Sequence, residues 1–211
     1  MDTELLSPSI SGFLKKYSND DSSEMEAYSV INKIPFTGRM TGDFLSFVVR
    51  LLKPCMLLEI GTGIGFSTKK MCISTDCKII SIDSNRQRVE VAKDFLKEHR
   101  QVELQHVKAQ HFLKETDHKF DFVFVDSTKN FYPLVWNYLK NRLMDEAIVI
   151  FDDIFLYGLV SYEDAEIPYK YKEQTKNLRL FIDEIMYDEN LNSTILPIGN
   201  GLLLVNYSCK S

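Results

Sequence analysis

The fold is decided by one stretch, Leu57-Leu58-Glu59-Ile60-Gly61-Thr62-Gly63-Ile64-Gly65-Phe66-Ser67. Its apolar first part predicts a buried parallel strand that ends at an acid, and three alternating glycines then lead into a helix that opens at Ser67. Glycines let a backbone approach a ligand closely, and Glu59 can accept hydrogen bonds from hydroxyls or amines. Phe66 stands where a dinucleotide fingerprint has its third glycine, so the loop favours a nucleoside without a pyrophosphate over NAD.

After this loop the pattern alternates strands and helices, which predicts a doubly wound α/β sheet. A capping box, Ser84-x-x-Gln87, is predicted to start the helix after the second strand. Two final runs joined across Gly199-Asn200-Gly201 predict an antiparallel hairpin at the sheet edge. Seven strands are predicted in all, and together they give a mostly parallel, Rossmann-like sheet whose first strand is the one before the glycine loop. The other predicted strands are Lys78–Asp83, Val102–Val107, Phe120–Val125, Ala147–Phe151, Ser193–Pro197 and Leu202–Tyr207.

The part of the chain before the first strand is predicted to be helical. Helices are expected over Leu5–Tyr17, Ser22–Lys33 and Gly42–Leu52, the last ended by Pro54. The turn-rich connection Ile34–Gly42 is expected either to fold over the ligand as a lid or to be an ordinary loop between helices. A long polar region after Gly158 is also predicted to be helical.

Length and composition limit the class of protein. With 211 residues, 45% of them hydrophobic, the chain is expected to form one globular domain with a substantial core. Met1-Asp2-Thr3-Glu4 lacks the basic region of a signal peptide, and no apolar run reaches about 20 residues. These features predict a cytoplasmic protein with no membrane partner. The net charge of −5 argues against a broad nucleic-acid face but is compatible with a local basic patch.

The four cysteines are Cys55, Cys72, Cys77 and Cys209, and they form no C-x-x-C pair. Their apolar surroundings favour reduced structural thiols over zinc ligands or disulfides. A disulfide between Cys72 and Cys77 is the weaker alternative.

Acids also end the later strands. Asp83 lies about 20 residues past the glycine loop, where a ribose-binding carboxylate is expected; the weaker alternative is a residue that starts a helix. Asp126 ends the fourth predicted strand, and Asp152 and Asp153 end the fifth. Because the carboxyl ends of parallel strands meet on one side of a sheet, these acids and the glycine loop should converge. Clustered carboxylates repel, and Mg²⁺ would relieve the repulsion; the alternative for each acid is a helix cap.

Lys129 follows Asp126 by three residues. Beside a metal its ammonium form is disfavoured, which would suit it to take a proton from a hydroxyl. The alternative is a solvated lysine at a helix start, and the residues alone favour that interpretation.

The glycine loop, the segment Val125-Asp126-Ser127-Thr128-Lys129 and the pair Asp152-Asp153 together resemble a known family. It is the metal-dependent, S-adenosylmethionine-using O-methyltransferases, which include the catechol and caffeoyl-CoA methyltransferases. The resemblance runs from about Ile34 to the end of the chain. The bacterial tRNA 5-hydroxyuridine methyltransferases look most similar. That likeness rests on Glu26-Ala27-Tyr28, Ile34-Pro35, Gly158-Leu159-Val160 and Ile195-Leu196-Pro197-Ile198-Gly199-Asn200-Gly201-Leu202.

The resemblance implies one methyltransferase domain over residues 1–211, with residues 1–53 as a helical lid or extension and residues 54–211 as the Rossmann-like core. It implies that Asp83 holds the ribose of S-adenosylmethionine and that Lys129 is the base, with Asp126 also catalytic. Other cofactor-binding residues implied by it are Thr37 and Thr41 in the lid, Glu59, Gly61, Gly63 and Ser67 around the methionine part, Ala109 and Gln110 near the adenine, and Asp126. The implied ligands of Mg²⁺ or another divalent cation are Asp126, Asp152 and Asp153.

Two residues depart from the family pattern. Asp153 stands where the family usually has asparagine, and Asn200 stands where it usually has aspartate. The extra negative charge at residue 153 should bind a cation more tightly, and it should also raise the pKa of a bound substrate hydroxyl.

The implied reaction requires a substrate with two adjacent oxygens that chelate the cation. The branch resemblance ranks 5-hydroxyuridine in tRNA first and a small catechol-like or caffeoyl-CoA-like phenol second. A cofactor-binding module without catalysis, which binds RNA or another partner, is a further alternative. A homodimer is what the family suggests. If the substrate is tRNA, its phosphates are expected to contact a basic patch, and the alternative is that this patch is only a solvated helix face. The patch consists of Lys170, Lys172, Lys176 and Arg179.

Overall fold

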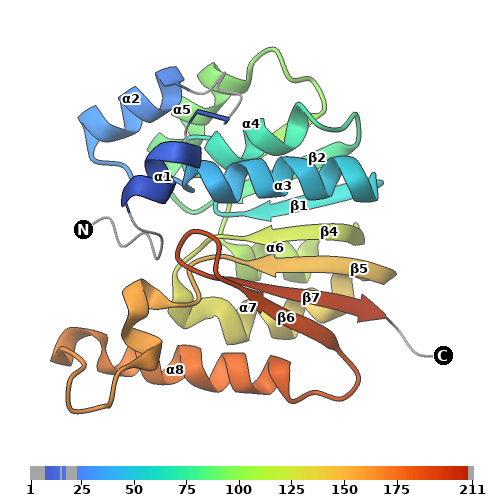
Figure 1. Cartoon of the computed structure of the whole chain (residues 1–211). Coiled ribbons are helices and arrows are strands. Elements are labelled where there is room, and N and C mark those ends of the chain that lie inside the picture. The colour runs from blue at the N-terminus through green and yellow to red at the C-terminus, as the bar shows by residue number, and fades with distance from the viewer. Residues whose placement is uncertain (1–7, 15, 18–22, 209–211) are drawn as a thin grey trace.

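The structure is a computed structural model that describes residues 8–14, 16–17 and 23–208. At its centre lies one seven-stranded sheet (Figure 1). The strands are β1 (Met56–Ile60), β2 (Lys78–Asp83), β3 (Val102–His106), β4 (Phe120–Val125), β5 (Leu143–Phe151), β6 (Asn192–Leu196) and β7 (Leu202–Ser208). Their order across the sheet is β3-β2-β1-β4-β5-β7-β6.

The first five strands are parallel, and β7 pairs antiparallel with both β5 and β6. This confirms the predicted doubly wound sheet with a C-terminal hairpin. Because the chain moves outward from β1 to β2 and β3, then returns to β4 on the other side of β1, the strand order reverses between β1 and β4. A ligand crevice is expected at the carboxyl ends of the strands at such a reversal.

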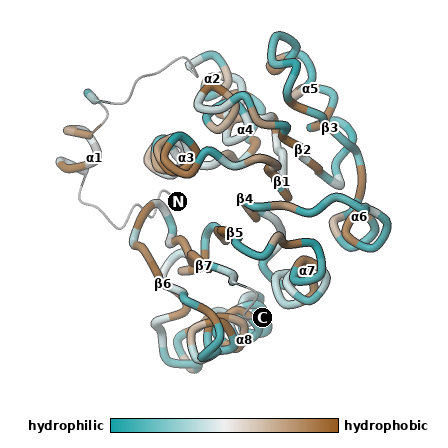
Figure 2. Tube along the Cα trace, turned by 90° about the vertical axis from the view of Figure 1, so that its right-hand side faces the viewer, coloured by the Kyte–Doolittle hydropathy of each residue, from teal (hydrophilic) through white to brown (hydrophobic). Residues whose placement is uncertain are grey.

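Helices cover both faces of the sheet (Figures 1 and 2). The helices are α1 (Pro8–Leu14), α2 (Ser23–Asn32), α3 (Arg39–Leu52), α4 (Phe66–Cys72), α5 (Arg86–Leu96), α6 (Ala109–Glu115), α7 (Tyr132–Leu139) and α8 (Tyr169–Met186). Three 3₁₀ turns complete the elements of the described residues: η1 (Lys129–Phe131), η2 (Lys140–Arg142) and η3 (Leu156–Ser161). Figure 2 shows α3 and α4 on one side of the sheet and α6, α7 and α8 on the other.

Strand β4 shows how the sequence builds two cores from one sheet. Phe122 and Phe124 pack with the residues of α3 and α4, whereas Val123 and Val125 pack with those of α6, α7 and α8. Neighbouring side chains on a strand point to opposite faces, so a strand covered on both sides must be apolar throughout. The nearly continuous apolar run of β4 is therefore the sign of its central place.

Several predicted boundaries are corrected by the structure. Helix α5 is capped by Asn85, whose Oδ1 accepts a hydrogen bond from the Arg88 N–H at 3.2 Å, and not by Ser84. Helix α3 begins at Arg39, before the predicted start at Gly42, so Thr41 lies in its first turn and not in the connecting loop. Strand β5 begins at Leu143, four residues before the predicted start.

The predicted helix Leu5–Tyr17 is described as α1 only over Pro8–Leu14, and its beginning lies outside the described residues. Cys55, Cys72 and Cys77 are free thiols, so the alternative Cys72–Cys77 disulfide is not formed; Cys209 lies outside the described residues. Within the described part of the chain, no helix combines the length and apolar character needed to cross a membrane.

Candidate functional site

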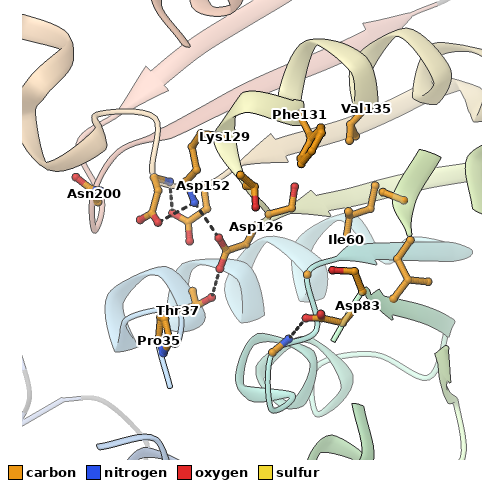
Figure 3. A pocket seen from close by; sticks show the side chains of 18 of the residues that line it. Pro35, Thr37, Ile60, Asp83, Asp126, Lys129, Phe131, Val135, Asp152 and Asn200 are labelled. Atoms are coloured by element: carbon orange, nitrogen blue, oxygen red, sulfur yellow. Dashed lines mark hydrogen bonds and ion pairs between the residues drawn. The ribbon is translucent and has the colours of Figure 1, made fainter. Parts of the chain in front are cut away.

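A cavity of about 840 Å³ lies at the carboxyl ends of the central strands (Figure 3). Apart from Glu59 and Ser67, each residue that the sequence marked for the site contributes to its wall. These wall residues are Thr37, Thr41, Gly61, Gly63, Asp83, Ala109, Gln110, Asp126, Lys129, Asp152 and Asp153. The fold therefore brings together residues that are up to 116 positions apart, from Thr37 to Asp153.

The glycine loop holds the ends of three strands together. The backbone N–H of Gly61 donates to the carbonyl of Ile82 in β2 at 2.8 Å, and the N–H of Asp126 donates to the carbonyl of Ile60 at 2.8 Å. A Cβ on Gly61 would stand 1.8 Å from the Asp126 carbonyl oxygen, so only glycine fits there. Gly63 has a φ of +53°, and a Cβ added to it would meet nothing within 4 Å, so it faces open space in the cavity.

Glu59 lies behind the loop and not in the cavity wall. Its carboxyl is fully buried and accepts hydrogen bonds from the hydroxyls of Ser67 and Ser81 at 2.5 Å and from that of Thr68. Burial raises the pKa of Glu59 to about 7, although the hydroxyl donors act in the opposite direction. In this structure Glu59 and Ser67 support the loop from below, and their predicted direct contact with a cofactor stays a prediction.

Asp83 stands at the end of β2 and faces the cavity beside the glycine loop (Figure 3). One carboxylate oxygen accepts from the Gly63 N–H at 2.9 Å, and the other accepts from the Asn85 N–H at 2.7 Å. Each carboxylate oxygen can accept more than one hydrogen bond, so capacity for ligand hydroxyls is left. Ala109 and Gln110, the first residues of α6, line the same end of the cavity.

Three carboxylates and one ammonium form the other end of the site (Figure 3). Asp126 directly follows β4, and Asp152 and Asp153 directly follow β5. The Asp152 N–H donates to the Val125 carbonyl at 2.9 Å, which sets the two strand ends side by side. Asp153 has a φ of +56°, a conformation that costs a non-glycine residue about 1 kcal/mol or more and is common at functional sites.

The ammonium of Lys129 lies between two of these acids. Its Nζ is 3.2 Å from Asp126 Oδ1 and 2.9 Å from Asp153 Oδ2. Burial and the neighbouring carboxylates raise the pKa of Asp152 well above its usual range, and burial is the chief cause of the raised pKa of Asp126. Burial alone would lower the pKa of Lys129, but the neighbouring carboxylates of Asp126 and Asp153 act in the opposite direction, and the pKa of Lys129 lies above its usual value. In this arrangement Lys129 holds its proton, so its role as a base stays a prediction.

The segment before α3 covers one side of the site. Thr37 Oγ1 donates to Asp126 Oδ2 at 3.3 Å, and the ring of Phe36 packs on that of Phe66 with centroids 5.0 Å apart. Thr41 is buried beside Gly199, where an added Cβ would stand 2.6 Å from its hydroxyl oxygen. The predicted lid segment therefore contacts the acid end, the glycine loop and the β6–β7 turn.

The chemistry of the acids fits a divalent cation, because hard cations prefer carboxylate oxygens. The same oxygens already contact one positive charge, the ammonium of Lys129. Among the residues that the structure describes, however, no three His, Cys, Asp or Glu side chains are gathered as a formed metal centre. Two of the acids are instead bridged by Lys129. The predicted ligands Asp126, Asp152 and Asp153 thus share the site with an internal cation.

Several residues of the site were not recognised from the sequence. The hydroxyl of Tyr132 contacts the carbonyls of Asp152 at 2.7 Å and Val125 at 3.2 Å. Only its position three residues after Lys129, close to one helical turn, gave a signal. The cavity wall also includes aromatic side chains and two cations at the Asp83 end, for which the sequence gave no periodic signal: Phe131, Tyr157, Tyr171, Arg88 and Lys108.

A glycine loop after β1, an acid at the end of β2 and a cavity at the reversal of strand order define a Rossmann-like fold with a nucleoside-type site. The family model described as O-methyltransferase matches residues 22–208. The chain belongs to this O-methyltransferase family. The match confirms the enzyme class predicted from the sequence, that of S-adenosylmethionine-dependent O-methyltransferases.

A named relative agrees with the assignment, and solved structures share the fold. A caffeoyl-CoA O-methyltransferase of Populus kitakamiensis is 25% identical over 179 residues, which cover 80% of this chain and 76% of that protein. The O-methyltransferase TomG of Streptomyces achromogenes, solved in complex with SAM, has a TM-score of 0.82 with 22% identity, and the match covers 99% of each chain. The SAH-bound methyltransferase PaMTH1 of Podospora anserina has a TM-score of 0.80 with 19% identity, and the match covers 96% of this chain and 97% of that one.

Proposed function

We propose that this protein transfers the methyl group of S-adenosylmethionine to a ring hydroxyl that has a second oxygen beside it, with the help of a divalent cation. The observation that carries the proposal is one continuous cavity with Asp83 and the glycine loop at one end and Lys129 among three carboxylates at the other. A cofactor and an acceptor bound at these two ends would meet between them. Such positioning supplies a large part of the rate enhancement in bimolecular reactions.

The cofactor end supports a nucleoside. Asp83 offers acceptor oxygens for two ribose hydroxyls, while Ala109 and Gln110 line the wall beyond it. Gly61 and Gly63 keep the loop free of side chains, so that a methionine moiety can approach the backbone. Glu59 acts here as the support of that loop.

The acid end supports a cation that Asp126, Asp152 and Asp153 would hold. A bound divalent cation lowers the pKa of a hydroxyl that it contacts and thereby favours the nucleophilic oxyanion. The chain itself holds Asp126 in place through Thr37 and fixes the backbone of Asp152 through Tyr132. Lys129 carries positive charge at the place where negative charge would develop on the acceptor oxygen.

The wall beside the acids favours a planar acceptor. Phe131 and Tyr157 are each about half exposed and line the cavity, together with the partly buried Tyr171. Aromatic side chains pack well against flat rings. A small phenol with vicinal oxygens is therefore the first candidate substrate, and the name of the Populus kitakamiensis relative, a caffeoyl-CoA O-methyltransferase, agrees with this class.

The tRNA 5-hydroxyuridine that the sequence ranked first becomes the second candidate. Lys170 and Lys172 are exposed on α8 on either side of Tyr171, a residue of the cavity wall, and this position favours contact with phosphates near the opening. Arg179 does not add to such a patch, because it pairs with Asp164 at 2.6 Å and donates to the Val160 carbonyl at 3.0 Å.

The test is transfer of labelled methyl from S-adenosylmethionine to a catechol and, in parallel, to tRNA that contains 5-hydroxyuridine, each with Mg²⁺ and with a chelator. Label on the catechol that disappears with the chelator is the expected result. Label on tRNA alone would make the second candidate the function. Cofactor binding without label on either acceptor would favour the non-catalytic module, and label that persists with the chelator would overturn the role of the cation.

Further expectations belong with this proposal. We expect residues 34–42 to act as a lid over the cofactor, since Thr37 and Phe36 already contact the two halves of the site. The single domain over residues 1–211, the cytoplasmic location and the homodimer stay predictions.

A further inference from the structure

Lys129, the residue expected to act as a base, contacts two acids of the site. Its side chain is 11% exposed and its Nζ bridges Asp126 and Asp153, which come from the ends of two different strands (Figure 3). The third acid, Asp152, is 3% exposed, and its Oδ1 accepts the Asp153 N–H at 2.7 Å. Three carboxylates in a buried site require compensating positive charge, and Lys129 is placed to supply it.

We infer that the Lys129 ammonium is a resident counter-cation, which holds Asp126 and Asp153 together when no metal is bound and competes with the divalent cation for their oxygens. The inference rests on the proposed role of that cation. A metal ion held by Asp126 and Asp153 would draw on carboxylate oxygens that now accept from Lys129. Binding would therefore weaken or share two charge-assisted hydrogen bonds, which are the strong ones in proteins.

Asp153 supplies one of the two ionic contacts that hold the ammonium. The Nζ of Lys129 lies 2.9 Å from Asp153 and 3.2 Å from Asp126. A neutral amide in place of the Asp153 carboxylate would remove one of the two ionic contacts. The Asp153 carboxylate would attract a metal ion by its charge, but it also holds the Lys129 ammonium, which competes with that ion.

The test measures metal binding and not turnover. Mn²⁺ is titrated into the full chain, freed of metals beforehand, and the dissociation constant is obtained from the paramagnetic resonance signal of the free ion. Lys129→Gln removes the ammonium and keeps a polar side chain, so its affinity for Mn²⁺ should exceed that of the wild type by roughly tenfold to a hundredfold, the range for losing one or two charge-assisted hydrogen bonds. Lys97→Gln, at an exposed position directly after α5 and outside the cavity wall, is the control and should bind as the wild type does.

A second variant at position 129 and a check of folding separate an effect on metal binding from misfolding. Lys129→Met has a similar length and no charge, and circular dichroism checks that each variant is folded. Mn²⁺ should raise the melting temperature of both Lys129 variants by more than that of the wild type, because tighter binding at a given ligand concentration stabilises the folded state more. Equal or weaker binding by folded Lys129 variants, with binding by the wild type, would overturn this inference alone. No binding by any of the proteins would overturn the proposed cation itself, and the inference with it.

Discussion

The hydroxyl of Tyr132 donates a 2.7 Å hydrogen bond to the backbone carbonyl of Asp152, and this contact ties the start of α7 to the strand end that carries two of the acids. Tyr132→Phe keeps the ring and its packing but leaves a buried carbonyl without this donor. Unfolding in urea should show a loss of about 1–3 kcal/mol of stability. The turnover number should fall by about tenfold because Asp152 is less firmly placed.

The affinity of Tyr132→Phe for S-adenosylhomocysteine should not change, since Asp83 and the glycine loop make no hydrogen bond to Tyr132 among the described residues. Tyr138→Phe is the matched control on the same helix, and it should leave both stability and turnover near the wild-type values. A change in cofactor affinity equal to the change in turnover would contradict the proposed local role.

The buried Glu59 predicts a pH dependence of stability. Its pKa is about 7 in the folded protein and 4.5 as an ordinary glutamate, so the folded state holds the proton more tightly. The stabilisation is complete below about pH 4.5 and is lost as the pH rises through 7. Glu59→Gln carries no such proton, so the wild type should lose about 3 kcal/mol relative to this variant between pH 4.5 and 8.

The measurement is urea unfolding of both proteins over that pH range. Asp126 and Asp152 also titrate, but they are present in both proteins, so their effect largely cancels in the difference. A difference that stays flat with pH would show that Glu59 is not protonated on burial. Its three hydroxyl donors would then stabilise the anion fully.

The main effect of changing Asp83 should be on cofactor binding. Asp83→Ala removes the acceptors proposed for the ribose hydroxyls together with the contact to the Gly63 N–H, so the dissociation constant of S-adenosylhomocysteine should rise roughly tenfold to a hundredfold. Isothermal titration gives this constant directly. Asp94→Ala, at an exposed position of α5, is the control. Unchanged affinity in Asp83→Ala would exclude Asp83 from the nucleoside site.

Much of the fold could be predicted from the sequence because the central strands must be apolar on both faces. The run Phe120–Val125 and the glycine loop indicated the middle of the sheet, and Gly199-Asn200-Gly201 indicated the final hairpin. Boundaries were less certain wherever two signals compete. Ser84 and Asn85 are both good helix caps, and only the backbone conformation of Asn85 decides between them.

The position of the three acids could be predicted from where the strands end in the sequence, but the contacts among their side chains could not. Parallel topology brings Asp126, Asp152 and Asp153 to one edge whatever their side chains do. Whether Lys129 points to solvent or to these acids depends on tertiary packing that no spacing encodes. Glu59 shows the same limit, because a strand-end acid can face a ligand or, as here, turn inward to Ser67 and Ser81.

Two glycines of the same loop should respond differently to alanine. At Gly61, with a φ of +110°, the new Cβ would stand 1.8 Å from the Asp126 carbonyl oxygen, so Gly61→Ala must separate β1 from β4 and should leave little folded protein. Gly63→Ala meets nothing within 4 Å and carries only the strain of a left-handed residue, about 1–2 kcal/mol.

Gly63→Ala should therefore fold, as a thermal melt would show, yet bind S-adenosylhomocysteine more weakly, because its methyl group enters the space proposed for the cofactor. Titration of the folded variant separates this effect from lost stability. If Gly63→Ala binds the cofactor as tightly as the wild type, the methionine part does not pass over this residue. The cofactor would then have to lie nearer the start of α6, where Ala109 and Gln110 line the cavity.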